Sequence, residues 1–170
     1  MPHELLETAN FIRQVERNSS FEGVWPVAKF ERLKALLNSD QGEVQVRLRF
    51  CDRAGIACLR GSVSAELDVL CQRCLQPMTI AVSGGFLFGL ISSEDEMDAL
   101  PDDMEPLLVM DAEQSLIDIV EDELLLLLPQ VSAHAEACSE YLLQQDERRQ
   151  ADKMASSPFA VLKNLMSDKT

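Results

Sequence analysis

Cationic side chains are missing from the middle of this chain. Residues 74–147 contain no lysine or arginine but seventeen acidic residues, whereas residues 1–73 hold ten residues of each sign, and the net charge is −14. Such a segment repels a phosphate backbone and attracts cations through the same Coulomb interaction. It is therefore either a solubilising surface or a surface for a basic partner, and it argues against a nucleic-acid interface in that part of the chain.

Long apolar runs and an export signal are also lacking. No run approaches the roughly 18–20 apolar residues of a membrane span, and the N-terminal "MPHELLETANF" has no basic segment followed by an apolar one. We therefore expect a cytoplasmic protein with no membrane partner. In a reducing compartment the five cysteines favour metal binding or thiol chemistry over a disulfide framework.

Catalytic motifs are absent as well. The chain has two histidines and no glycine-rich phosphate loop, GxSxG or HExxH sequence. The acidic run of Glu121, Asp122 and Glu123 is more typical of a solvated helix face than of a catalytic carboxylate cluster. We therefore predict a protein that is not an enzyme and has no small-molecule substrate.

The hydrophobic pattern predicts an α+β fold. Helical spacing covers residues 4–17 and 27–38, and alternation then marks strands over 44–50, 56–69 and 78–90, with a bulge or bend at Gly84-Gly85. These strands should form a small antiparallel sheet of three to five strands, with "LLVM" at 107–110 as an edge strand.

A leucine-rich helix should pack on this sheet. It starts near Ser115, where Asp118 completes a capping box, and it ends at Pro129. Five consecutive leucines, 124–128, suggest a helix buried on most sides.

The remaining segments set the domain organisation. Residues 91–106 are acidic and contain two prolines, and they indicate a mobile loop. We expect one α+β domain over residues 1–140, with N-terminal helices and the CxxC motif, followed by a helical, partly mobile C-terminal tail over 141–170.

The stretch "LCQRCLQP" carries the sharpest chemical signal. Cys71 and Cys74 have the spacing of a metal-ligand pair, of a redox pair, or of two small buried thiols. A redox CxxC normally opens a helix, whereas Pro77 and an alternating strand follow here. His134 and Cys138 are usable as a second pair, and all four ligands would close a structural zinc site. Cys51 and Cys58, by contrast, fit buried strand positions and receive no role.

Four segments together resemble the YceD-like family, the bacterial and plastid large ribosomal RNA subunit accumulation proteins. They are "FEGVWPVAKFERL", "ELDVLCQRCLQPM", "SLIDIVEDELLLLLPQVSAH" followed by Cys138, and "SPFAVLKNL". The resemblance implies a cytoplasmic protein needed for processing or accumulation of 23S ribosomal RNA, with no established enzymatic activity. Many relatives have Cys-x-x-x-Cys after the helix, so the resemblance implies a metal-ligand pair at His134 and Cys138, with histidine in the first position.

Three hypotheses for the mechanism follow. The first is an adaptor whose acidic middle holds a basic ribosomal protein or an RNA-processing factor, with Arg73 and the tail residues Pro158, Phe159 and Leu162 as further partner contacts. The second is direct binding of ribosomal RNA. Its cations would be Arg47, Arg49, Arg148 and Arg149, with Arg53 and Arg60 also on the hairpin. A thiol redox or metal-dependent enzyme ranks last.

Overall fold

The computed structural model describes residues 5–110, 113–139, 141–145 and 148–149. By contacts the chain divides into two compact units. Unit 1 comprises the described residues up to Leu70 together with Pro77–Gln130, and unit 2 comprises Cys71–Gln76 and the described residues from Val131 on. The sequence-based division at residue 140 stays a prediction. No helix in the described part of the chain is long and apolar enough to cross a membrane.

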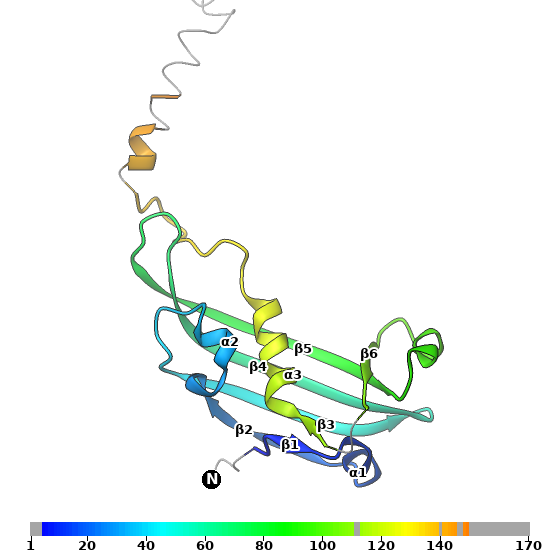
Figure 1. Ribbon diagram of the computed structural model, residues 1–170. Helices are drawn as coiled ribbons and strands as arrows, with labels where there is room; N and C mark the ends of the chain where they lie inside the picture. The colour runs from blue at the N-terminus through cyan, green and yellow to red at the C-terminus, as the bar shows by residue number, and fades with distance from the viewer. Residues whose placement is uncertain (1–4, 111–112, 140, 146–147, 150–170) are drawn as a thin grey trace, which may run out of the picture. The chain divides into compact units, whose positions relative to one another are not determined.

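Unit 1 is built on a five-stranded sheet in the order β2-β3-β4-β5-β6 (Figure 1). The strands are β2 (Ser20–Pro26), β3 (Glu43–Arg53), β4 (Ile56–Leu70), β5 (Pro77–Ile91) and β6 (Glu105–Leu108). The strands from β2 to β5 pair antiparallel with one another, and β6 pairs parallel with β5. The α+β class is therefore confirmed, with a mixed sheet, because the chain crosses over after β5 and returns in the same direction.

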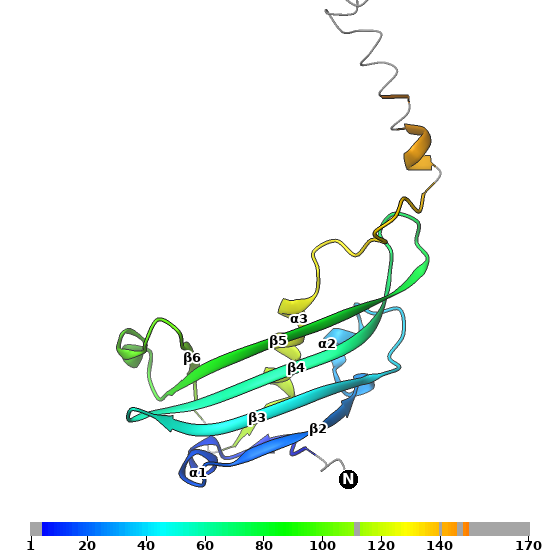
Figure 2. The ribbon, with the colours of Figure 1, turned by 180° about the vertical axis from the view of Figure 1, so that it is seen from behind.

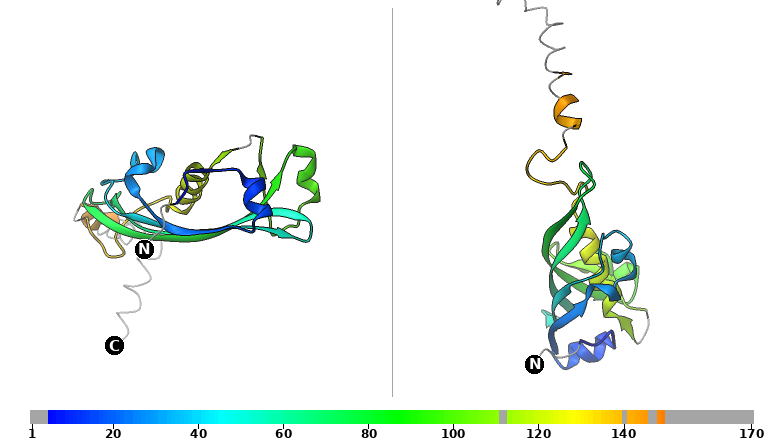
Figure 3. Two further views of the ribbon diagram at one scale, coloured as in Figure 1. Left: turned by 90° about the horizontal axis from the view of Figure 1, so that it is seen from below. Right: turned by 90° about the vertical axis from the view of Figure 1, so that its left-hand side faces the viewer.

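One face of this sheet is buried and the other is open. On β3 the side chains of Val44, Val46 and Leu48 are buried, while Gln45 and Arg47 between them are exposed. Alternate residues of a strand point to opposite faces, so β3 turns its apolar side chains to the core. Figures 2 and 3 show that the helices of unit 1 lie on one side of the sheet.

The covered face carries short elements and one longer helix. They are β1 (Thr8–Ala9), α1 (Phe11–Glu16), the 3₁₀ turn η1 (Val27–Lys29), α2 (Glu31–Lys34), β7 (Gln114–Ser115) and α3 (Leu116–Leu127). β1 and β7 form a separate two-stranded antiparallel sheet. The core between these elements and the large sheet holds Phe11, Trp25, Phe30, Phe50 and Leu116, all almost completely buried.

The leucine-rich helix is confirmed as α3. Its N-cap is Ser115, whose Oγ accepts a hydrogen bond from the Asp118 N–H at 3.2 Å. Leu116, Val120 and Leu124 are buried. Burial on most sides is wrong, however, because Leu126 is 78% exposed and the helix therefore covers the sheet with one face only.

The N-terminal elements are shorter than the pattern predicts. The helix expected over residues 4–17 begins at Phe11, because Asn10 caps it by accepting the Arg13 N–H at 3.0 Å, and β1 precedes it. The helix expected over 27–38 is reduced to η1 and α2. The sequence pattern did not predict strand β2. Trp25 is the only fully buried residue of this strand, which leaves too weak an alternation to recognise it.

Glycines in β5 and β4 serve close packing. Of the two alternatives expected at Gly84-Gly85, the bulge is wrong, since β4 and β5 pair without interruption from Cys58↔Gly89 to Leu70↔Pro77; the bend stays a prediction. A Cβ on Gly84 would lie 2.6 Å from a methyl carbon of Leu127, so the missing side chain lets α3 approach the sheet.

The loop expected over residues 91–106 contains ordered structure. A 3₁₀ helix, η2, covers Glu94–Ala99, Met104 is buried, and β6 begins at Glu105. The segment is therefore not a loop throughout, because η2 lies within it and β6 pairs with β5 at its end, while its mobility stays a prediction.

Candidate metal centre and charged surfaces

A tight turn in unit 2 brings the two cysteines of the CxxC motif together. The Cys71 N–H donates to the Gln76 carbonyl oxygen at 2.9 Å, and the Leu75 N–H donates to that of Cys71 at 2.8 Å. Leu75 adopts a left-handed conformation with φ of 59°, which closes the turn in a region that non-glycine residues seldom occupy. The loop over residues 71–76 therefore has a specified shape.

Hydrogen bonds join this loop to the second segment of unit 2. The Gln72 N–H donates to the Ser132 carbonyl oxygen at 2.8 Å. The guanidinium of Arg73 donates to the carbonyl oxygens of His134 and Glu136, the latter at 2.8 Å. Arg73 therefore has a structural task within unit 2, and its role toward a partner stays a prediction.

The joined segments bring four candidate ligands together. Cys71, Cys74, His134 and Cys138 each offer one atom, and all four atoms lie within 4.8 Å of one another. The Cys71 and Cys138 Sγ atoms are 3.6 Å apart, and Cys74 Sγ is 3.5 Å from His134 Nδ1. All five cysteines of the chain are free thiols. These four residues form a group that could hold a metal ion.

The thiols of this group differ in acidity. Burial alone would raise the pKa of Cys71, but the backbone N–H groups of Cys74, His134 and Arg73 outweigh it and lower that pKa to about 5. The pKa of Cys138 is raised, first by burial and then by the neighbouring Cys71 and Cys74. Backbone N–H groups therefore already stabilise negative charge on the sulfur of Cys71.

The other two cysteines lie in unit 1 and face each other across β3 and β4. Cys51 pairs directly with Cys58, whose thiol donates to the Cys51 carbonyl oxygen at 3.1 Å. Burial, followed by the contact with Cys51, raises the pKa of Cys58 to about 12. Nothing in this geometry gives these thiols a chemical role.

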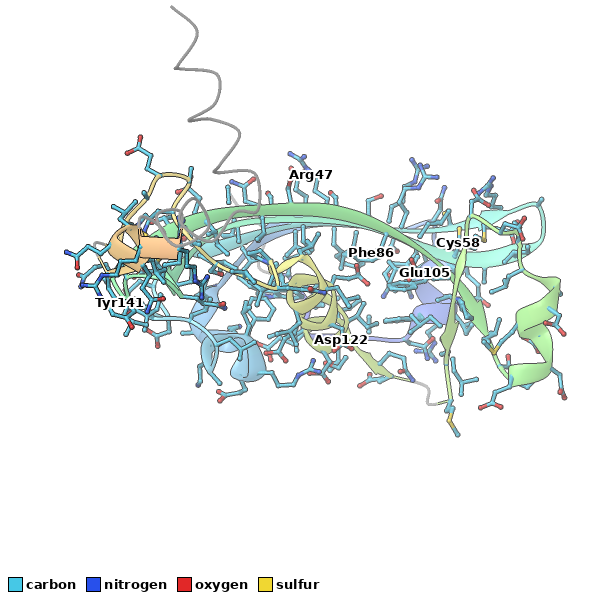
Figure 4. All side chains as sticks on the ribbon, turned by 90° about the horizontal axis from the view of Figure 1, so that it is seen from above. Arg47, Cys58, Phe86, Glu105, Asp122 and Tyr141 are labelled. Atoms are coloured by element: carbon cyan, nitrogen blue, oxygen red, sulfur yellow. The ribbon has the colours of Figure 1, made fainter. Side chains whose placement is uncertain are left out.

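Arginines gather on the open face of the sheet, where Figure 4 shows Arg47 pointing away from the helices. Arg47 forms an ion pair with Glu22 at 2.8 Å, and both side chains are exposed. Arg49 stands directly opposite Arg60 in the pairing of β3 with β4. Neither forms an ion pair with any residue that the structure describes. A groove of about 820 Å³ is lined in part by these three arginines.

The facing position of Arg60 was missed from the sequence, although the signal was present. Ala54 and Gly55, with φ of 57° and 87°, form a two-residue hairpin turn. A two-residue turn fixes the register, so Arg49 must face Arg60. Of the remaining candidates, Arg148 and Arg149 are exposed residues of unit 2, whereas Pro158, Phe159 and Leu162 lie outside the described residues.

Acidic side chains gather on the side of unit 1 that carries the helices, where Figure 4 shows Glu105 and Asp122. Two exposed acids of this region, Asp103 and Asp122, form ion pairs with Arg53 and Arg32. The other exposed or half-buried acids of η2, α3 and the segments around β6 are Glu94, Asp95, Glu96, Asp98, Asp102, Glu105, Glu113, Asp118 and Glu123. We call this set the acidic surface. Within the described ranges none of its members is in an ion pair. The pKa of Glu123 is raised, first by burial and then by the nearby Glu105 and Asp122.

Glu121 corrects the interpretation of the acidic run as a solvated helix face. It is buried, and its Oε1 accepts the N–H groups of Arg32 and Leu33 at 2.7 and 3.1 Å. Its Oε2 accepts the Nε–H of Arg32 at 2.8 Å. Glu121 thus caps α2 from α3 and holds the two helices together, while the neighbouring Asp122 is exposed.

The chain is similar in sequence to known proteins. A family model described as "Large ribosomal RNA subunit accumulation protein YceD" matches residues 59–166. A protein of Haemophilus influenzae with that same description is 31% identical over 163 residues, which covers 93% of this chain and 94% of the relative. No solved structure matches. The chain belongs to the YceD family of large ribosomal RNA subunit accumulation proteins.

Proposed function

We propose that this protein is a cytoplasmic, non-enzymatic adaptor needed for processing or accumulation of 23S ribosomal RNA. It acts by binding a basic ribosomal protein or an rRNA-processing factor through the acidic surface. The name of its Haemophilus influenzae relative supports the link to large-subunit rRNA.

The observation that carries this proposal is the unbalanced charge of the acidic surface. No lysine or arginine occurs between residues 74 and 147, and the raised pKa of Glu123 reports repulsion from Glu105 and Asp122 in addition to burial. Like charges held close together destabilise the folded protein, and a cationic partner removes that repulsion. The acidic surface therefore suits a basic protein.

Two charge-neutralised variants of the full chain test this proposal. Glu105→Gln with Glu123→Gln removes two charges from the acidic surface, while the matched control, Glu22→Gln with Glu43→Gln, removes two from β2 and β3. Each tagged chain is purified from cells at low salt, with and without ribonuclease, and the bound proteins are identified.

The wild type and the control should retain one defined basic ribosomal protein or processing factor after ribonuclease treatment. The acidic-surface variant should lose it, and high salt should release it, because exposed charges interact over a Debye length of only about 8–10 Å. Cells that carry only this variant should accumulate less mature 23S rRNA. Equal retention by both double variants would refute the proposal.

The adaptor would also bind its partner outside the acidic surface. Arg73 and the tail residues Pro158, Phe159 and Leu162 are its other candidate partner contacts. Truncation before Pro158 should weaken capture of the same partner if the tail takes part.

Direct binding of ribosomal RNA is the second candidate, and the facing pair of Arg49 and Arg60 favours it. Like charges directly opposite each other across two strands are destabilising. A phosphate group placed between them would accept hydrogen bonds from both guanidinium groups and neutralise the repulsion. Arg47 lies beside them on the same groove, whereas Arg148 and Arg149 are the other candidate cations.

A gel-shift titration with 23S precursor RNA over a salt series tests this candidate. Arg49→Ala and Arg60→Ala should each weaken binding and reduce the slope of log affinity against log salt by about 1. Arg17→Ala, which removes an exposed arginine of the α1 terminus, serves as the control. A flat salt response, or an equal loss with Arg17→Ala, would exclude the open face as the RNA-binding surface.

A further inference from the structure

We infer that Cys71, Cys74, His134 and Cys138 together bind one Zn²⁺ ion in a closed, tetrahedral, structural site. This inference goes beyond the proposed adaptor function and does not depend on it, since it concerns how unit 2 is held together.

The spacing of the ligand atoms fits a tetrahedral zinc ion. With Zn–S distances of about 2.3 Å and tetrahedral angles, two sulfur ligands lie about 3.8 Å apart, and a sulfur and a nitrogen ligand lie about 3.6 Å apart. The Cys71–Cys138 Sγ distance is 3.6 Å, and the distance from Cys74 Sγ to His134 Nδ1 is 3.5 Å. The other pairs of ligand atoms lie within 4.8 Å, so one ion can reach all four.

A disulfide accounts for this geometry less well. Bonded sulfur atoms lie about 2.03–2.05 Å apart, and the two closest sulfurs here are much farther apart than that. A disulfide would also use only two of the three cysteines, and it would not explain why the third thiol and the imidazole lie at the same place. Convergence of four donors from two distant parts of the chain is the property of a metal site.

The donor set selects the ion. Thiolate and imidazole ligands suit zinc, whereas Mg²⁺ and Ca²⁺ require oxygen ligands. Three cysteines and one histidine complete a four-coordinate site and leave no position for water or substrate. The site therefore serves structure and not Lewis-acid catalysis.

The surrounding backbone is arranged to support the ligands. Arg73 bonds to the carbonyl oxygens of His134 and Glu136, and the Gln72 N–H bonds to that of Ser132. These contacts hold the two segments against each other without help from an ion. The guanidinium of Arg73 also places a positive charge beside a centre that three thiolates and one Zn²⁺ would leave with a net negative charge.

Unit 2 needs such a crosslink, because its described residues contain almost no core. Cys71 is the only one of them that is buried. A fold with so few buried apolar residues is normally held by disulfides or by metal ions. The ligands also join residues 60 and 67 positions apart in the chain, so the ion would hold the loop over 71–76 against the segment over 131–138.

Elemental analysis of the full-length protein, purified with a thiol reductant and without added chelator, tests the inference. We expect about one zinc per chain. Reconstitution of the metal-free protein with Co²⁺ should give the visible ligand-field bands of tetrahedral coordination and the sulfur-to-cobalt charge-transfer absorption. Proteolysis should cut unit 2 of the metal-free protein faster than that of the zinc-loaded protein.

Variants show which residues bind the ion. Cys71→Ser, Cys74→Ser, His134→Ala and Cys138→Ser should each lower the zinc content at least several-fold. The matched controls Cys51→Ser and Cys58→Ser should retain it. The fluorescence of Trp25, the only tryptophan of the chain and a residue of unit 1, reports whether a variant still folds.

Any of three results would overturn the inference. One is a fully reduced, folded protein that contains no zinc and gives no cobalt spectrum on reconstitution. Another is zinc retained by all four ligand variants, which would place the ion elsewhere. A Cys71–Cys138 disulfide found by mass spectrometry in the protein as isolated from cells would also replace the metal site with a covalent crosslink.

Discussion

Removal of the Glu121 carboxylate should destabilise unit 1 more than any exposed acidic substitution. Glu121 is 5% exposed, and its carboxylate accepts the N–H groups of Arg32 and Leu33 as well as the Nε–H of Arg32. In Glu121→Ala both backbone donors at the start of α2 lose their acceptor, and the link between α2 and α3 is lost.

The magnitude follows from the groups left without a partner. A buried donor that loses its acceptor costs about 1–3 kcal/mol, and removal of one member of a buried ion pair costs about 3–5 kcal/mol. The Arg32 side chain is 52% exposed and can turn to water, which places the expected loss near the lower end, about 3 kcal/mol. For a chain of this size the melting temperature should fall by roughly 6–12 °C.

Urea unfolding followed by Trp25 fluorescence measures this loss directly. Trp25 is 1% exposed in the core of unit 1, so its emission reports the unfolding of that unit. The control is Asp122→Ala, which removes an exposed partner of the same Arg32 at 2.7 Å and should cost about 0–1 kcal/mol. Equal losses for Glu121→Ala and Asp122→Ala would refute the reasoning, since burial would then make no difference.

Acidification gives a second test of the same carboxylate. Burial raises the pKa of Glu121, but the Leu33 N–H and the side chain and N–H of Arg32 outweigh it and hold that pKa below its ordinary value of 4.5. A depressed folded pKa means that the charge stabilises the protein above 4.5 and that this contribution is lost as pH falls through the folded pKa. The stability difference between the wild type and Glu121→Gln should therefore be constant near neutral pH and shrink below pH 4.5.

Two further substitutions test the packing of the core. Gly61→Ala should cost about 1–3 kcal/mol, because the added Cβ would lie 2.0–2.6 Å from three ring carbons of Phe86. In the control Gly85→Ala the added Cβ meets only ordinary contacts. Urea unfolding compares the two variants, and equal stability would contradict the close packing of Gly61 against Phe86. Trp25→Phe should cost only about 1–2 kcal/mol for the cavity left by the smaller ring, because the buried Nε1–H has no partner among the described residues and a phenyl ring can keep the edge-on contact with Phe30. Thermal unfolding by circular dichroism checks it, and a loss above 3 kcal/mol would indicate an acceptor for that N–H.

Local signals predicted the parts of the fold that depend on neighbouring residues. Ser115 and Asp118 fix the start of α3 through one local hydrogen bond, and the alternation from Val44 to Phe50 specifies β3 whatever lies beside it. The CxxC motif of Cys71 and Cys74 is likewise a local signal, because both residues lie in one tight turn. The candidate ligands were therefore identifiable as a set, although only the fold brings His134 and Cys138 to them.

The features that were missed depend on distant partners. Glu121 is buried because Arg32 and Leu33, almost ninety positions earlier, supply its hydrogen-bond donors, and no pattern within α3 contains that information. Strand β6 runs parallel to β5 because of how the chain crosses over between them, while its four residues alone fit either direction. Burial of a charge and the direction of an edge strand are decided by tertiary contacts.

Net charge alone gives a misleading picture of the surfaces of this protein. A net charge of −14 predicts repulsion of RNA at long range, yet salt screens exposed charges beyond about 8–10 Å, so a bound phosphate responds mainly to the side chains beside it. On the open face these side chains include the facing arginines of β3 and β4, and on the side of the helices they include the carboxylates of the acidic surface. The two surfaces belong to opposite sides of one sheet. A protein bound to the acidic surface and an RNA bound to the open face would therefore not compete with each other. Charge changes on one surface should therefore alter one kind of binding and leave the other intact, which separates the adaptor from the direct RNA-binding mechanism.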